Sequence, residues 1–168
     1  MNPIVCAQNL QARKTILSPG RHYRYVLWRK VGTDPNNNTV CTFVMLNPST
    51  ADETVNDPTI TRCMGFAESW GYGWLCVVNL FACRATDPDD MQRFFDPVGP
   101  DNDAWLQLVV AEADMVVAAW GVNGSYKNRD VIVKKTLPKL HVLKLTKYRH
   151  PAHPLYLKKT LGPQLWTA

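Results

Sequence analysis

The sequence lacks the features that mark membrane, secreted and metal-dependent proteins. No apolar run approaches the ~18 residues of a membrane span, and Met1–Leu17 has neither the basic start nor the continuous apolar core of a secretory signal. The five cysteines include no C-x-x-C pair, so neither a zinc site nor an iron–sulfur cluster is predicted. We expect a cytoplasmic protein with reduced structural thiols, no metal and no membrane contact.

Glycine-rich phosphate loops are also missing. Neither G-x-G-x-x-G nor G-x-x-x-x-G-K-[ST] occurs, which argues against kinases and dinucleotide enzymes and leaves no organic cofactor to expect. The chain has 168 residues, of which 46% are hydrophobic and 20% charged, as is typical of one globular domain. We expect an N-terminal arm over residues 1–20 and one domain over residues 21–168, monomeric or weakly associating, with no obligate protein partner.

Charge is unevenly distributed along the chain, although the formal net charge is only +5. Residues 85–114 carry eight acids against one base, whereas residues 126–159 carry ten bases against one acid. A one-signed stretch can be a plain solvated surface, but this imbalance favours a polyanion partner such as nucleic acid. Lys147 and Arg149 are the candidate DNA contacts within it.

Apolar runs with strand character alternate with helical segments. The expected strands are 23–31, 40–46, 74–78, 115–120 and 141–145, and the expected helices are 58–70, 101–113 and 125–137. This alternation predicts an α/β fold, a three-layer sandwich around a central, mostly parallel sheet. Turn formers over residues 32–39 predict that residues 23–46 form an antiparallel hairpin.

Polar segments follow the expected strands at residues 47–52, 79–84, 121–124 and 146–154. Ligands of open α/β sheets bind beyond the carboxyl ends of the strands. The segments therefore predict a site at one edge of the sheet. Each residue also has a structural interpretation, since asparagines end strands, Asp52 and Asp57 are typical capping acids, and Arg84 suits a surface.

Three motifs resemble those of an uncharacterised domain family of bacteria and phages. They are NPSTAD at Asn47–Asp52, NLFACRATDP at Asn79–Pro88 and HPAHPLY at His150–Tyr156, within a resemblance that runs from about Tyr23 to Leu157. More distantly, the order of the motifs resembles the uracil-DNA glycosylase superfamily. That second resemblance implies a uracil-DNA-glycosylase-like fold and a hydrolase that acts on a base flipped out of DNA.

The superfamily resemblance implies roles for the residues after the first two motif strands. Asn47 resembles the residue that positions the attacking water, and Asp52 or Asp57 would supply a carboxylate as base or as stabiliser of the sugar cation. Asn79 resembles the amide that reads the flipped base. Met45 departs from the pattern, because the superfamily usually has glycine there.

The last motif implies the remaining contacts. His150 or His153 resembles the histidine that donates to the pyrimidine O2, and the two prolines leave this register uncertain by three residues. Leu155 or Tyr156 falls where a wedge residue would fill the vacated stack. Apart from the resemblance, Arg84 of the second motif is a secondary candidate for a phosphate or base contact.

The residue after the first motif's proline bears on the substrate. Strict uracil enzymes of that superfamily carry a tyrosine there, which blocks substituents at pyrimidine C5. Here Ser49 follows Pro48, so the resemblance implies a base pocket with room at C5. We expect a monofunctional DNA glycosylase that excises a C5-modified pyrimidine and leaves an abasic site. We expect this base to be a mismatched thymine or a hypermodified phage base such as glucosylated hydroxymethylcytosine, the latter in antiviral defence.

Two other classes of function remain open on the sequence. A small-molecule nucleotide or nucleoside hydrolase would use the same strand-end site, and the basic stretch would then be incidental. A module that binds modified bases without catalysis would also suit the motifs.

Overall fold

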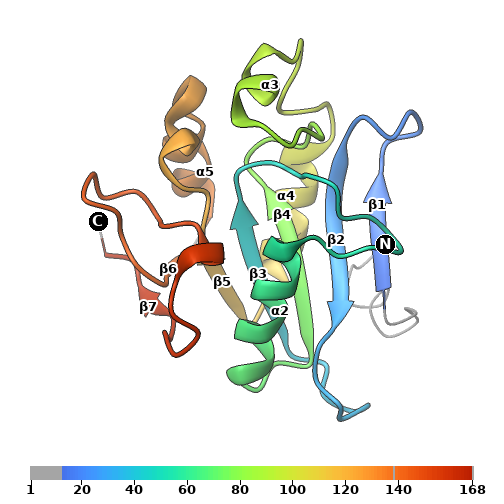
Figure 1. The fold of residues 1–168 in the computed structure, drawn as a ribbon, viewed down its shortest axis with the longest axis vertical. Helices are drawn as coiled ribbons and strands as arrows, with labels where there is room; N and C mark the ends of the chain where they lie inside the picture. Colours follow the sequence, from blue (N-terminus) through green and yellow to red (C-terminus); the bar gives the residue numbers. More distant parts are fainter. Residues whose placement is uncertain (1–12, 138, 168) are drawn as a thin grey trace.

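The computed structural model describes residues 13–137 and 139–167, whose strands form one seven-stranded sheet in the order β1-β2-β4-β3-β5-β6-β7 (Figure 1). The strands are β1 (Arg13–Leu17), β2 (Arg24–Lys30), β3 (Val40–Met45), β4 (Trp74–Asn79), β5 (Met115–Ala118), β6 (His141–Val142) and β7 (Gln164–Leu165). Strands β4, β3, β5 and β6 run parallel in the centre, and antiparallel pairs flank them. The predicted α/β fold with a mostly parallel central sheet is confirmed.

Helices cover both faces of the sheet. They are α2 (Pro58–Ser69), α3 (Pro88–Arg93), α4 (Asn102–Ala111) and α5 (Arg129–Thr136), with the 3-10 helices η1 (Val122–Asn128) and η2 (Pro154–Tyr156). Figure 1 shows α2 in front of the sheet and α4 behind it. The packing agrees, because Ile60 and Phe66 of α2 join one core cluster while α4 and α5 contribute to the other. Within the described residues, no helix has the length and apolarity that a membrane span requires.

The two central strands β3 and β4 are buried along their whole length. Their near-continuous apolar sequences suit a position covered on both faces, and each fully buried aliphatic side chain contributes roughly 1.5–3 kcal/mol. Cys41 and Cys76 lie in these strands as predicted, and burial raises the pKa of both thiols. Cys63 and Cys83 are also buried free thiols, whereas Cys6 lies outside the described residues.

The predicted hairpin of residues 23–46 is wrong. Strand β2 pairs antiparallel with β4, for example Leu27 with Val77, and β4 therefore lies between β2 and β3. The turn-rich loop between β2 and β3 does reverse the chain direction. It does not make them neighbours, because β3 instead pairs parallel with β4 on one side and β5 on the other.

Three expected element boundaries are also corrected. Residues 13–17 of the expected arm form the edge strand β1, and residues 1–12 lie outside the described part. The expected helix 125–137 is broken at Tyr126 and Lys127, whose backbone angles are not helical, so α5 begins only at Arg129. The last expected strand shortens to β6 because Leu145 bridges to Pro151 instead of continuing along β5.

The start of α2 was predicted correctly. Asp57 is its N-cap, and its Oδ1 accepts a hydrogen bond from the backbone N–H of Ile60 at 2.8 Å. Pro58 occupies the first turn, where its missing N–H costs nothing. This cap brings the Asp57 carboxyl to the carboxyl-end edge of the sheet.

Candidate functional site

A cleft of about 540 Å³ opens where β3, β4 and β5 end. The sequence-predicted residues that line it are Asn47, Ser49, Asp57, Asn79, His153 and Tyr156. They come from segments that lie up to 109 positions apart in the sequence, from Asn47 to Tyr156, and the parallel strands bring these segments to one edge. The predicted convergence of strand ends is therefore present.

Asn79 is the most unusual polar residue of the cleft. It ends β4, is 1% exposed, and neither Nδ2 nor Oδ1 of its side chain has a hydrogen-bond partner among the described residues. A buried polar group left unpaired costs about 1–3 kcal/mol. The amide is thus a free donor and a free acceptor held in the wall of the cleft.

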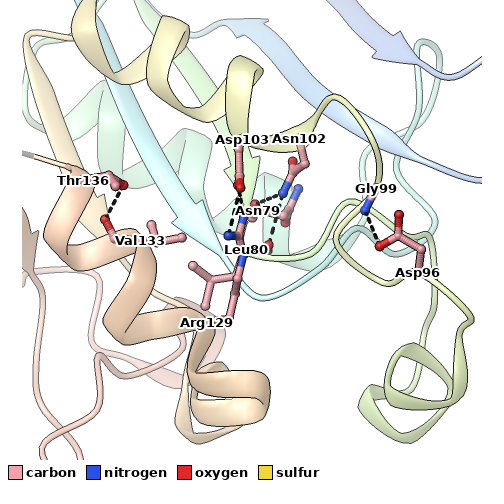
Figure 2. A network of polar contacts seen from close by, with 9 residues as sticks. All are labelled: Asn79, Leu80, Asp96, Gly99, Asn102, Asp103, Arg129, Val133 and Thr136. Atoms are coloured by element: carbon pink, nitrogen blue, oxygen red, sulfur yellow. Dashed lines mark hydrogen bonds and ion pairs between the residues drawn. The ribbon is translucent and has the colours of Figure 1, made fainter.

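The backbone around Asn79 is fixed by a polar network (Figure 2). Nδ2 of the buried Asn102 donates to the carbonyl oxygens of Asn79 and Leu80 at 3.0 and 3.1 Å. The buried Arg129 donates through Nε to the same Leu80 oxygen at 2.8 Å and pairs with Asp103. Helices α4 and α5 therefore both hold the end of β4, which fixes the backbone from which the Asn79 side chain extends.

Asn47 is oriented by its own neighbours. Its Nδ2 donates to the carbonyl oxygens of Pro48 and Ala85 at 3.1 and 2.7 Å. Since two acceptors hold the amide nitrogen, Oδ1 is the atom left to accept a hydrogen bond from a bound molecule. Asn47 can therefore accept from a water or a hydroxyl group in the cleft, but its donors are in use.

The two candidate carboxylates have different environments. Asp57 is buried and lines the cleft. Asp52 is absent from the cleft wall, and its Oδ1 accepts from the N–H of Thr54 and Val55 and from the Thr54 hydroxyl. These hydrogen bonds lower the pKa of Asp52 to about 2. Asp52 thus shapes the loop before α2, and Asp57 is the carboxylate of the site.

The two candidate histidines also separate. His153 lines the cleft, and its Nδ1 accepts from the N–H of Leu155 at 3.4 Å. Burial lowers the pKa of His153, although Asp57 opposes this shift. The imidazole is therefore neutral near pH 7 with its proton on Nε2, a donor without a charge. His150 does not line the cleft and faces Asp130, with Nδ1 3.8 Å from Oδ2.

The remaining predicted contacts lie outside or at the rim of the cleft. Tyr156 is 86% exposed and lines the cleft, whereas Leu155 lines a separate groove along α2. Pro48 is buried and holds Asn47 through its carbonyl, and it does not line the cleft. The other predicted DNA contacts lie outside the cleft wall: Arg84 is half-buried, and Lys147 and Arg149 are exposed.

Arg24 is a residue of the cleft that the sequence analysis missed. It is 2% exposed, lines the cleft, and donates through Nη1 to the carbonyl oxygen of Ala51 at 2.8 Å. Burial lowers its pKa to about 10, although Asp57 opposes the shift. The sequence gives no distinct signal for it, because Arg24 is one of three basic residues in β2, together with Arg29 and Lys30.

Arginines hold the loop of residues 51–56, which leads into α2. Each contacts a different part of it, namely Arg13 with Thr54, Arg21 with Glu53, Arg24 with Ala51, and Arg29 with Asp52, Val55 and Asn56. Fixed in this way, the loop positions Asp57 before any ligand arrives.

Comparison with known proteins identifies the family. Residues 24–155 match the family described as "Protein of unknown function (DUF1643)". The chain belongs to this family. The matched range contains the NPSTAD and NLFACRATDP motifs and all but the last residue of HPAHPLY.

No curated protein and no solved structure matches the chain. The resemblance to the uracil-DNA glycosylase superfamily is therefore a hypothesis that rests on the motif order and the cleft chemistry. Within the described residues, histidine, cysteine and acidic side chains do not gather in any group of three that could hold a metal ion.

Proposed function

We propose that this DUF1643 domain is a DNA glycosylase that hydrolyses the N-glycosidic bond of a C5-substituted pyrimidine and leaves an abasic site. The observation that carries the proposal is the Asn79 amide, buried in the cleft wall with both polar atoms unpaired. One donor beside one acceptor is the complement of a pyrimidine's hydrogen-bonding edge. A flipped base would satisfy both atoms at once.

The reaction breaks the bond between C1′ and the base nitrogen and leaves the electron pair on the base. Positive charge develops on the sugar and negative charge on the base, and the oxygen of a water then bonds to C1′. No redox partner is needed. The water's proton passes to a nearby base or to the departing pyrimidine.

His153 suits the leaving group. Its neutral imidazole donates from Nε2 to the pyrimidine O2 as charge develops there, and a neutral donor leaves the proton with the enzyme. Burial, which lowers the pKa of His153, keeps this form near neutral pH. Removing one such donor typically costs about 10² to 10³ in rate.

Asn47 and Asp57 suit the sugar side. Asn47 Oδ1 accepts from the attacking water, and the Asp57 carboxylate stabilises the positive sugar or takes the water's proton. Both groups line the same cleft as His153 and Asn79. Since an amide is a poor base, most of the acceleration must come from charge stabilisation.

Ser49 supports the choice of a C5-substituted base. It is a small residue in the cleft wall, and a small side chain leaves space where a larger one would exclude a C5 substituent. A hypermodified phage base is the substrate we favour, with a role in antiviral defence.

The experiment is a gel assay on duplexes that carry uracil, a thymine mismatch or glucosylated hydroxymethylcytosine, each followed by alkali to cleave abasic sites. We expect strand cleavage at a C5-substituted base. Cleavage of uracil DNA alone would contradict the inference from Ser49 that the base pocket has space for a C5 substituent. If the DNA stays intact and free nucleosides or nucleotides are hydrolysed, the domain is instead a small-molecule hydrolase. If modified DNA is bound and not cleaved, the domain is a module that binds modified bases without catalysis.

Asn79→Leu is the sharpest variant for this assay. Leucine has the same branched arrangement of four side-chain heavy atoms as asparagine but no polar atoms, so we expect cleavage to fall at least 100-fold while thermal stability changes little, because no hydrogen bond within the protein is lost. Asn36→Ala, in an exposed loop, serves as the control and should behave like the wild type. A large loss of stability in both Asn79→Leu and the smaller Asn79→Ala would mean that the amide is structural, whereas a loss in Asn79→Leu alone would reflect the larger volume of leucine.

A further inference from the structure

A second, smaller pocket of about 240 Å³ adjoins the cleft. Ser49, Ala85 and Thr86 line both hollows and form the wall that they share. The other lining residues of the small pocket are Arg21, His22, Thr50, Arg84 and Phe94. It offers two guanidinium groups, an imidazole and three hydroxyl groups, which is the donor set of an anion site.

The charge of this pocket comes from Arg84. Arg21 forms a two-pronged pair with Glu53, at 2.6 and 2.9 Å, which offsets both charges. The Arg84 side chain has no ion-pair or hydrogen-bond partner among the described residues, and it is half-buried. Its field reaches the cleft, because it is one cause of the lowered pKa of Arg24, after burial.

The pocket is built in advance from three chain segments. The N–H of Arg84 donates to the His22 carbonyl at 2.9 Å, and the N–H of Ala85 donates to the Pro48 carbonyl at 2.9 Å. Asn47 adds the side-chain bond to Ala85. These bonds hold the backbone of the three segments around one hollow, so a ligand would need to order only side chains.

We infer that this pocket binds a phosphodiester of the nucleic acid strand next to the nucleotide held in the cleft, with Arg84 as its charged contact. The inference rests on the proposed function, since it assigns the backbone of that same substrate. The hydroxyl groups of Ser49, Thr50 and Thr86 donate to the phosphate oxygens. The shared wall means that base and phosphate are held on opposite sides of Ser49 and Thr86, which favours a polynucleotide over a free nucleoside.

The test measures binding to a duplex with one tetrahydrofuran abasic analogue, so that the identity of the base does not matter. Arg84→Ala should lower affinity about tenfold and reduce the salt slope by about one. Methylphosphonates, which are uncharged, should weaken wild-type binding when placed beside the analogue and should not weaken Arg84→Ala further. Arg93→Ala is the matched control, because Arg93 is exposed and paired with Asp90.

The outcomes separate the subsite from the activity. If the wild type prefers abasic DNA and Arg84→Ala behaves like Arg93→Ala, the phosphate subsite is wrong and the glycosylase proposal stands. If Arg84→Ala weakens binding of abasic and unmodified duplexes equally and the wild type has no preference, the subsite stands and the glycosylase proposal loses its support. If the wild type binds neither duplex, both are overturned.

Discussion

The side-chain amide of Asn47 donates to the carbonyl oxygen of Ala85 at 2.7 Å, which ties the end of β3 to the segment that follows β4. The same nitrogen also reaches the Pro48 carbonyl. These two bonds occupy Nδ2 and leave Oδ1 as the acceptor, so a residue that helps to hold the wall of the cleft can still accept a hydrogen bond from a ligand.

Asn47→Asp should therefore destabilise the protein. A carboxylate cannot donate to the two carbonyl oxygens and repels them, so we expect the free energy of unfolding to fall by about 1–3 kcal/mol. Urea titration measures this, and Asp34→Asn in an exposed loop controls for a change of the same size and chemistry. Unchanged stability would show that the amide is not held as described.

His153 should make activity and stability depend on pH in the same direction. Because its pKa is lowered in the folded state by burial, the unfolded chain binds a proton first as pH falls below about 6.5. Stability from this group is thus present above that pH and is lost on acidification. Cleavage should fall over the same range, as the neutral donor becomes charged.

His153→Gln separates these effects, since glutamine donates a hydrogen bond and does not titrate. We expect it to keep more activity than His153→Ala and to flatten the acid limb of the pH–rate profile. An NMR titration of the wild-type imidazoles gives the independent check. A pKa of His153 above 7 would contradict the assignment.

Asp103→Ala should cost more stability than Arg129→Met, although the two residues form one ion pair (Figure 2). Removal of Asp103 leaves a guanidinium buried with only the Leu80 carbonyl, at a cost of about 1–3 kcal/mol. Removal of Arg129 leaves only the Asp103 carboxylate without its partner, and this carboxylate stays solvated because its side chain is 60% exposed. Asp90→Ala, which breaks an exposed pair with Arg93, should change the unfolding free energy by no more than about 0.5 kcal/mol. Equal effects of Asp103→Ala and Arg129→Met in urea titrations would refute the asymmetry.

Lys147 and Arg149 should contribute to nucleic acid affinity through charge alone. They are exposed in the loop after β6, where Thr146 lines the cleft. Replacement of both by alanine should weaken binding of all duplexes alike and reduce the salt slope by about two. Lys135→Ala, which removes an exposed charge from α5, should leave the slope unchanged. A loss of affinity confined to duplexes that carry one particular base would instead indicate that these residues recognise the base.

The site was largely predictable as a set of strand ends, and less so as individual residues. Asn47, Ser49 and Asn79 follow strongly apolar strands, so their place at the carboxyl edge followed from the pattern. Asp52 and Asp57, or His150 and His153, were indistinguishable in sequence, because both members of each pair lie in loops of similar composition. Arg24 was not predicted because the sequence of one strand does not show whether a charged side chain will be covered by other elements or exposed to solvent.

Apolar runs and the Asp57-Pro58 pair by themselves determined that this chain forms an α/β sheet with buried strands at β3, β4 and β5 and a capped helix from Pro58, because burial and capping are decided within a few neighbouring residues. Only the tertiary structure decided that β4 lies between β2 and β3, and that Asp57 and His153 face the cleft while Asp52 and His150 turn away from it. Strand order and side-chain direction depend on contacts between segments far apart along the chain. No local sequence pattern specifies which strands pair or which side chains face the cleft.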